Sequence, residues 1–343
     1  MVTILIFFAV LSLLVFVHEL GHFLAAKWAG VKVEEFGFGL PPRVLGKKIG
    51  QTLYSINLLP IGGFVKLLGE DGEFATIGDP KSFSVKSPKK RALILLAGVV
   101  GNLILATFIF TFLFNVGLPV FMEKPMFIEV DAGGIADLAG LKQWDKIIKM
   151  DDTKIDYHWD ASDYIRAHTG KEIKMVVKRE ETKLSFKVTP KPLLGVTISN
   201  FKDLKEVWWK TPYYGILETG KTLVQMATGI ASLIYSLFGG EKIATEVTGP
   251  IGIADMTRFF AELGYRYLLQ FVALLSVNLA FMNVLPFPAL DGGRLIFVAY
   301  ELITKKKAKA GIEARVTQVG FAILIAFMLW ITVKDVLRMG WLG

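Results

Sequence analysis

The chain of 343 residues contains no cysteine. This absence excludes disulfide bonds, and it excludes thiolate ligands from any metal site. Histidine is scarce as well, with 4 residues in the whole chain, so a histidine-based site has few candidate ligands. The apolar N-terminal run also lacks the basic n-region and the small-residue cleavage site of a signal peptide. We therefore expect this run to be retained as a membrane helix.

Apolar residues make up much of the chain, with 53% hydrophobic residues and a mean hydropathy of +0.49. These values are typical of a polytopic membrane protein and not of one soluble domain. The net charge of +8 could indicate nucleic-acid binding. The basic residues gather beside the apolar runs, however, where lysine and arginine set the topology of a membrane protein. We therefore expect contact with membrane lipid and no contact with nucleic acid.

The motif His18-Glu19-Leu20-Gly21-His22 continues an apolar run that begins at Val2. Residues four apart lie on one face of a helix, so both imidazoles can point at one metal ion. Glu19 is close enough to act as general base on a water bound to that ion. An ionisable side chain near the centre of a membrane segment costs roughly 2.5–3.5 kcal/mol, and such residues mark function. Three of them within five residues predict a metal site.

A site with two histidine ligands needs a third protein ligand and keeps one position open for water. His158 and His168 lie in a polar region that reads as soluble, which makes them poor candidates. Asp291 is a better candidate, because it is the only acid within residues 263–300, a strongly apolar segment. It lies in the sequence N-V-L-P-F-P-A-L-D-G-G at residues 283–293.

Together the two motifs resemble those of the site-2 protease family of intramembrane zinc metalloproteases. That family pairs H-E-x-x-H in its first core helix with N-x-x-P-x-P-x-L-D-G in a later helix, and both motifs are complete in this chain. The resemblance implies a zinc ion held by His18, His22 and Asp291, with Glu19 as the catalytic base. It also implies that Asn283 positions the substrate backbone.

The segment from Thr52 to Leu68 contains two short apolar runs that favour β-structure, separated by a proline and a pair of glycines. This pattern predicts a β-hairpin that is too short to span a bilayer. It resembles the family's re-entrant P-x-G-G segment, with Pro60, Gly62 and Gly63 in matching places. The resemblance implies that the two glycines lie in the substrate-binding part of the site. An ordinary cytoplasmic hairpin is the alternative.

Residues 122–199 resemble a PDZ domain of the bacterial protease type. The best matches are Ala139-Gly140-Leu141 and Asp145-x-Ile147-Ile148, while Trp144 stands where that family usually has glycine. A domain of this kind either binds a peptide or serves as a rigid cap. Residues 212–238 are apolar but carry two charges, so we expect an amphipathic helix on the outer membrane face, with a fifth span as the alternative.

The predicted fold is a polytopic α-helical membrane protein, with a four-helix transmembrane core, a re-entrant β-hairpin and an inserted PDZ-like α+β domain. The predicted segments, in chain order, are transmembrane helix one (1–26), a cytoplasmic loop (27–91) with the hairpin at about 52–68, helix two (92–117), the PDZ-like domain (122–199), an extracytoplasmic amphipathic region (200–264), a broken helix three (265–304) and helix four (318–338). Basic residues after helices one and three place those ends in the cytoplasm. Both chain termini are then extracytoplasmic.

The predicted function is zinc-dependent endopeptidase activity on transmembrane proteins that cross the bilayer once. The family resemblance implies regulated intramembrane proteolysis in the bacterial cytoplasmic (inner) membrane, with anti-sigma factors or signal-peptide remnants as typical substrates. One alternative is a catalytically silent membrane scaffold that holds partners through the PDZ-like domain. Such a scaffold has no need of the Glu19 carboxylate beside two histidines. A metal transporter is a further alternative, but it needs ligands along a path, and the sequence offers one cluster.

Overall fold

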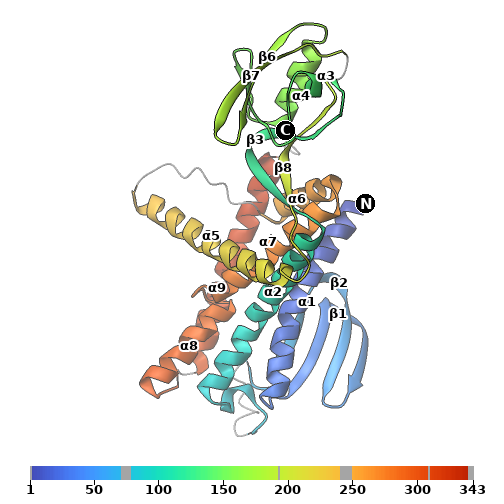
Figure 1. Cartoon of the computed structure of the whole chain (residues 1–343). Helices are drawn as coiled ribbons and strands as arrows, with labels where there is room; N and C mark the ends of the chain where they lie inside the picture. Colours follow the sequence, from blue (N-terminus) through green and yellow to red (C-terminus); the bar gives the residue numbers. More distant parts are fainter. Residues whose placement is uncertain (1, 71–78, 192–193, 240–248, 308–309, 339–343) are drawn as a thin grey trace. The chain divides into compact units, whose positions relative to one another are not determined.

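The computed structural model describes residues 2–70, 79–191, 194–239, 249–307 and 310–338. The chain divides into two compact units (Figure 1). The first unit combines Met1–Phe114 with Val207–Gly343, and the second is Asn115–Glu206. The second unit is therefore an insertion in the first, and it extends slightly beyond both ends of the predicted PDZ-like segment.

Four helices of the described chain are long and apolar enough to cross a membrane. They are α1 (Val2–Trp28), α2 (Pro88–Val116), α7 (Tyr265–Val284) and α9 (Ala310–Arg338). A helix satisfies its own backbone hydrogen bonds, and about 20 apolar residues span the hydrocarbon core of a bilayer. Together with the composition, these helices indicate a multi-pass membrane protein.

The third membrane segment is broken, as its two prolines predict. Helix α7 ends at Val284, and α8 (Asp291–Thr304) begins seven residues later. Pro286 and Pro288 lie between them and offer no backbone N–H group for a continuous helix. The break places Asp291 in the first turn of α8.

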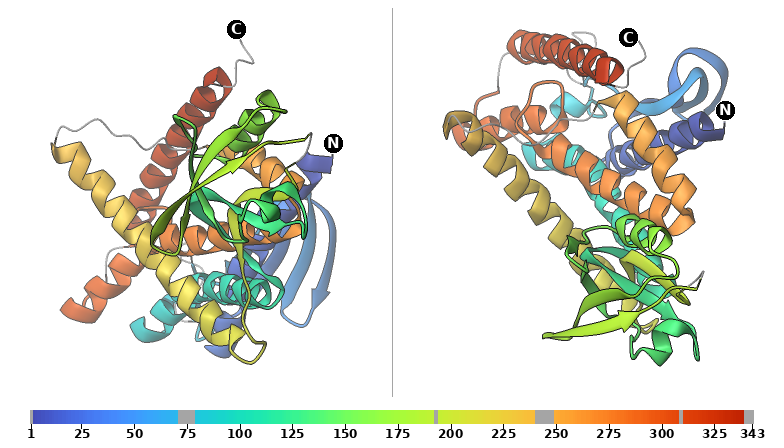
Figure 2. Two further views of the ribbon diagram at one scale, coloured as in Figure 1. Left: turned by 45° about the horizontal axis from the view of Figure 1, so that its top comes forward. Right: turned by 90° about the horizontal axis from the view of Figure 1, so that it is seen from above.

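Two further helices follow the inserted unit. Helix α5 (Thr211–Gly239) is one continuous helix that crosses α7 (Figure 2). Helix α6 (Pro250–Leu263) packs against α1, α7 and α9. Its first turn is held by a carboxylate from α9, because the Gly252 N–H group donates to Asp335 Oδ2 at 3.0 Å. A carboxylate is favourable beside the N–H groups that end a helix.

Strands β1 (Val33–Ile49) and β2 (Thr52–Leu67) form a long hairpin beside α1, with its turn at residues 50–51. Both strands bend, so each contributes two runs to the sheet. Residues 35–38 pair with 63–66 on one side and with 53–56 on the other, and residues 53–56 also pair with 45–48. The runs 63–66 and 45–48 therefore form the two edges of this sheet.

This pairing corrects the predicted hairpin at about 52–68. The two runs of that segment do not pair with each other, because residues 35–38 lie between them. The proline and glycines produce a bend within β2 and not a hairpin turn, with Gly62 at a φ of +72° that suits glycine. The prediction failed because the strand that separates the two runs comes from an earlier part of the chain.

The second unit is a mixed structure of strands and short helices. Its strands pair in the order β7-β6-β4-β3-β8, and β5 pairs with β4. The elements are β3 (Leu118–Val130), α3 (Ile135–Leu138), β4 (Lys146–Met150), β5 (Thr153–Lys154), α4 (His158–Ala167), β6 (Ile173–Arg179), β7 (Thr182–Val188) and β8 (Val196–Leu204). Its core is apolar and includes the fully buried Phe127, Ile147 and Met175.

A buried ion pair fixes the turn before β4. The Asp145 carboxylate is fully buried, and Arg179 donates to both of its oxygens at 2.7 Å. The hydrogen bond to Asp145 raises the pKa of Arg179. Trp144 adopts a φ of +73° and donates its backbone N–H to Phe127. The turn therefore keeps a conformation that favours glycine, although a tryptophan occupies it.

Candidate metal centre

His18 and His22 lie one turn apart on α1 and face the same side. Their Nε2 atoms are 3.1 Å apart, and both side chains are buried. Burial of two imidazoles in a membrane helix is unfavourable unless their nitrogen atoms have partners. The direction of both Nε2 atoms toward one point identifies that point as a candidate ion site.

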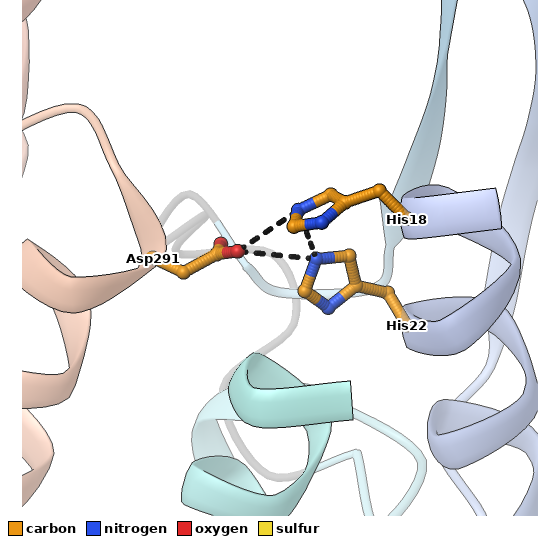
Figure 3. A group of neighbouring side chains, drawn as sticks. All are labelled: His18, His22 and Asp291. Atoms are coloured by element: carbon orange, nitrogen blue, oxygen red, sulfur yellow. Dashed lines mark hydrogen bonds and ion pairs between the residues drawn. The ribbon is translucent and has the colours of Figure 1, made fainter. Parts of the chain in front are cut away.

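Asp291 reaches the same point from α8. Its Oδ2 atom lies 3.1 Å from His18 Nε2 and 3.3 Å from His22 Nε2 (Figure 3). The loop before α8 folds tightly against the start of that helix. A Cβ atom at Gly292 would lie 2.1 Å from the Leu285 carbonyl oxygen, and one at Gly293 would lie 2.4 Å from the Phe287 carbonyl oxygen. The two glycines after Asp291 therefore allow the close packing that brings its carboxylate to the histidines.

The three side chains form a donor set that fits zinc. Their ligand atoms all lie within 4.8 Å of one another, and within the described ranges no other group of three such residues does so. Two imidazole nitrogens and one carboxylate oxygen are a common zinc ligand set, which leaves a fourth tetrahedral position for water. Such a set could hold a catalytic zinc ion.

Helix α2 forms the wall behind the two histidines. His22 Nδ1 donates to the Ile94 carbonyl oxygen at 2.8 Å, and His18 Nδ1 lies 3.4 Å from the Asn102 side-chain nitrogen. Between them, a Cβ atom at Gly98 would lie 2.3 Å from His22 Nε2. Gly98 therefore makes room for the imidazoles. The sequence indicates close helix contact at Gly98 and a packing or hydrogen-bonding role for Asn102, and it resembles the family's G-P-x-x-N motif there with Val99 in place of the proline. It does not reveal that the partners of this stripe are the two histidines.

A cavity of about 360 Å³ adjoins the three candidate ligands. Glu19 and Asn283 line it, so the structure brings the candidate base and this candidate substrate-binding residue to the same space. Gly62 and Gly63 are not among the residues that line this cavity, although both lie near α1. A Cβ atom at Gly62 would be 3.2 Å from Val15, and one at Gly63 would be 3.9 Å from Glu19 Cγ.

Strand β2 and a pair of charged side chains also line this cavity. An approach of this β-segment to the site was expected from the sequence, and the ion pair was not. Phe64 and Val65 of β2 line the cavity, together with an ion pair between Glu70 and Arg294. Arg294 lies one turn after Asp291 on α8, so this pair connects the end of β2 to the helix that carries the carboxylate. Pairing lowers the cost of keeping two charges partly buried.

Comparisons with known proteins identify the family to which the chain is similar. The model of peptidase family M50 matches residues 6–327. A candidate zinc metalloprotease of Clostridium acetobutylicum is 35% identical over 332 residues, which cover 95% of this chain and 94% of the relative. The zinc metalloprotease RasP of Geobacillus kaustophilus is 30% identical over 97% of both chains. RasP of Bacillus licheniformis is 30% identical over 98% of this chain and 99% of its own.

The metal content of variants tests the donor set. Asp291→Ala is expected to lower zinc affinity more than ~100-fold, because changes to groups that only support a ligand already cost about 10–100-fold. Glu19→Gln is expected to keep zinc in near-stoichiometric amounts, because that side chain lies beside the ligands and is not among them. Elemental analysis of the purified variants measures both. Full zinc content in Asp291→Ala would remove this residue from the ligand set.

Proposed function

Because the chain belongs to peptidase family M50, we propose that this zinc metalloprotease cleaves single-span transmembrane proteins within or at the edge of the bilayer. The family is that of the site-2 proteases. One observation carries the proposal: His18, His22 and Asp291 converge between helices of a chain with four candidate membrane spans. A hydrolytic site in such a place acts on peptide bonds that a soluble protease does not reach.

The proposed chemistry uses the three ligands and Glu19. His18, His22 and Asp291 would hold the zinc ion, and its chemistry would be to lower the pKa of a bound water to about 7. Glu19, which lines the same cavity, accepts the proton of the attacking water. The water oxygen forms a bond to the peptide carbonyl carbon, and the C–N bond breaks. Glu19 then gives this proton to the leaving amine nitrogen. The second proton of the water passes from the new carboxyl group to the amine, so that the products are a carboxylate and a protonated amine.

A transmembrane substrate must unwind before this reaction, because its carbonyl groups are bonded within a helix. We assign the edge run 63–66 of β2 as the partner of the unwound segment. This run pairs with β1 on one side, and two of its residues, Phe64 and Val65, line the cavity. An exposed strand edge can bind an extended peptide through backbone hydrogen bonds. Asn283 offers a polar side chain in the same cavity for the substrate backbone.

Substrate selection is assigned to the inserted unit. We propose that Asn115–Glu206 is a PDZ-like domain, on the basis of its strand-rich structure and the sequence resemblance around Asp145. Anti-sigma factors and signal-peptide remnants are the proposed substrates, since both cross the membrane once. This unit is inserted in the chain between α2 and α5, so it is covalently linked to two helices of the first unit.

Incubation of the detergent-purified protein with a panel of single-span substrates tests the proposed activity. Cleavage is expected to stop when a zinc chelator is added and to return with zinc. Glu19→Gln should lower the rate by about 10²–10⁴-fold, the usual contribution of a general base. Glu262→Gln is a matched control, because this residue lies on α6 away from the cavity lining. Equal cleavage by Glu19→Gln and the parent protein would refute the proposed mechanism.

Proline substitutions test the role of the strand edge. Neighbouring residues of a strand point their N–H groups to opposite sides, so of Phe64 and Val65 one donates toward β1 and the other away from it. One of the two variants Phe64→Pro and Val65→Pro removes the N–H group that points away from β1. This variant should stay folded and keep its zinc, and its cleavage rate should fall at least ~10-fold.

Proline at Lys47 or Lys48 gives the matched control, because these residues lie on the opposite edge of the same sheet. Whichever of these two variants stays folded should cleave normally. If both variants at positions 64 and 65 retain zinc and normal turnover, substrates do not pair with this edge.

We further propose that the protein lies in the bacterial inner membrane with both termini outside the cytoplasm. Single cysteines introduced at Lys48 and Lys307 should resist a membrane-impermeant thiol reagent on intact cells, and one at Lys154 should react. The parent chain has no cysteine that could react instead. After permeabilisation all three positions should be labelled. Reaction at position 48 in intact cells would reverse the proposed topology.

A further inference from the structure

One stripe of α2 faces both histidines. Ile94, Gly98 and Asn102 are spaced by four residues, so they lie on the same side of the helix. The Ile94 carbonyl oxygen meets His22 Nδ1, the missing side chain of Gly98 makes room for both rings, and the Asn102 amide meets His18 Nδ1. The outer nitrogen of each imidazole therefore has a partner on α2, while the inner nitrogen faces Asp291.

The protonation of His18 depends on which atom of the Asn102 amide it meets. A histidine that binds a metal through Nε2 has its proton on Nδ1, and this N–H group donates a hydrogen bond. The partner must then be an acceptor. The Asn102 side chain has one acceptor, Oδ1, which is buried and has no hydrogen-bond partner among the described residues. A half-turn of the planar amide places this oxygen where the nitrogen lies, without movement of neighbouring atoms.

We propose that Asn102 is a positioning residue for the metal centre, and that its side-chain oxygen accepts a hydrogen bond from His18 Nδ1. This bond fixes the imidazole tautomer that leaves the Nε2 lone pair directed at the ion. The proposal rests on the assignment of His18 as a zinc ligand. His22 obtains the same support from a backbone carbonyl, so the two ligands are held by chemically equivalent acceptors on one helix.

The surroundings of Asn102 leave no substitute for this bond. The residue is fully buried, so bulk water does not reach its amide. Its backbone carbonyl is engaged separately, because Ser276 on α7 donates to it at 2.8 Å. The backbone of Asn102 is thus tied to α7 while its side chain faces α1. A polar side chain buried among membrane helices is unfavourable unless it makes a hydrogen bond, and the bond to His18 provides one.

Zinc affinity of Asn102 variants, measured by chelator competition in detergent, tests the proposal. Asn102→Leu removes the acceptor at nearly constant volume and should weaken zinc binding about 10–100-fold. Asn102→Asp keeps an acceptor oxygen in the same place and should stay within about threefold of the parent protein. Asn102→Ala also removes the acceptor and should weaken zinc binding to the same extent. It serves as a second variant if leucine does not fit at this position. Cobalt substitution gives a second readout, because an altered His18 orientation should change the visible absorption of the bound ion.

Two controls separate the possible outcomes. Ser276→Ala disturbs the contact between α2 and α7 and leaves the Asn102 amide intact, so its zinc affinity should be unchanged. His18→Ala tests the assignment on which the proposal depends, and full zinc affinity in that variant would refute the ligand set itself. If His18→Ala loses zinc while Asn102→Leu and Asn102→Ala bind it as tightly as the parent, the positioning role is wrong. Equal weakening in Asn102→Asp and Asn102→Leu would show that His18 needs a donor, and it would also overturn the proposal.

Discussion

The metal centre depends on the close approach of α2 to α1. A Cβ atom at Gly98 would lie 2.3 Å from His22 Nε2, and one at Gly21 would lie 2.2 Å from the Ala97 carbonyl oxygen. Helix axes are usually 8–10 Å apart, and only small residues permit closer contact in a membrane. This contact brings the Ile94 carbonyl within 2.8 Å of His22. The glycines of these two helices thus determine the orientation of the imidazoles, and the orientation determines where an ion can bind.

The opposite wall of the centre is built by interrupting a helix. The loop between α7 and α8 lets Asp291 begin a new helix, where the unpaired N–H groups favour a carboxylate. Helix α9 packs directly against this loop at Gly320. A Cβ atom at that position would lie 2.2 Å from Pro288, so the close contact requires glycine. One wall of the centre is therefore formed by the packed helices α1 and α2, and the other by the loop between α7 and α8, which packs against α9. Between them lies the cavity that Glu19 lines.

The sequence predicted those parts of the structure that are determined by residues close together in the chain. The spacing of His18 and His22 follows from helix geometry, and Asp291 stands out as a lone acid in an apolar segment. The apolar runs likewise predicted the membrane helices and the break in the third. The partner of the two runs in β2 could not be inferred, because it lies at residues 35–38 and strand pairing between distant segments has no local signal. The contact between Asn102 and His18 is hidden for the same reason, since it depends on how two helices pack.

The metal centre joins positions that are far apart in the chain. His18 and Asp291 are separated by 273 residues, and an ion bound by both would connect α1 to α8. In a chain without cysteine, such an ion would act as a cross-link that closes a loop of most of the protein. During synthesis the two histidines emerge early, and the carboxylate is made only after the inserted unit and α7 are complete. A chain that stops before Asp291 therefore lacks one of the three candidate ligands, so the candidate zinc site can be completed only after α7 has been made.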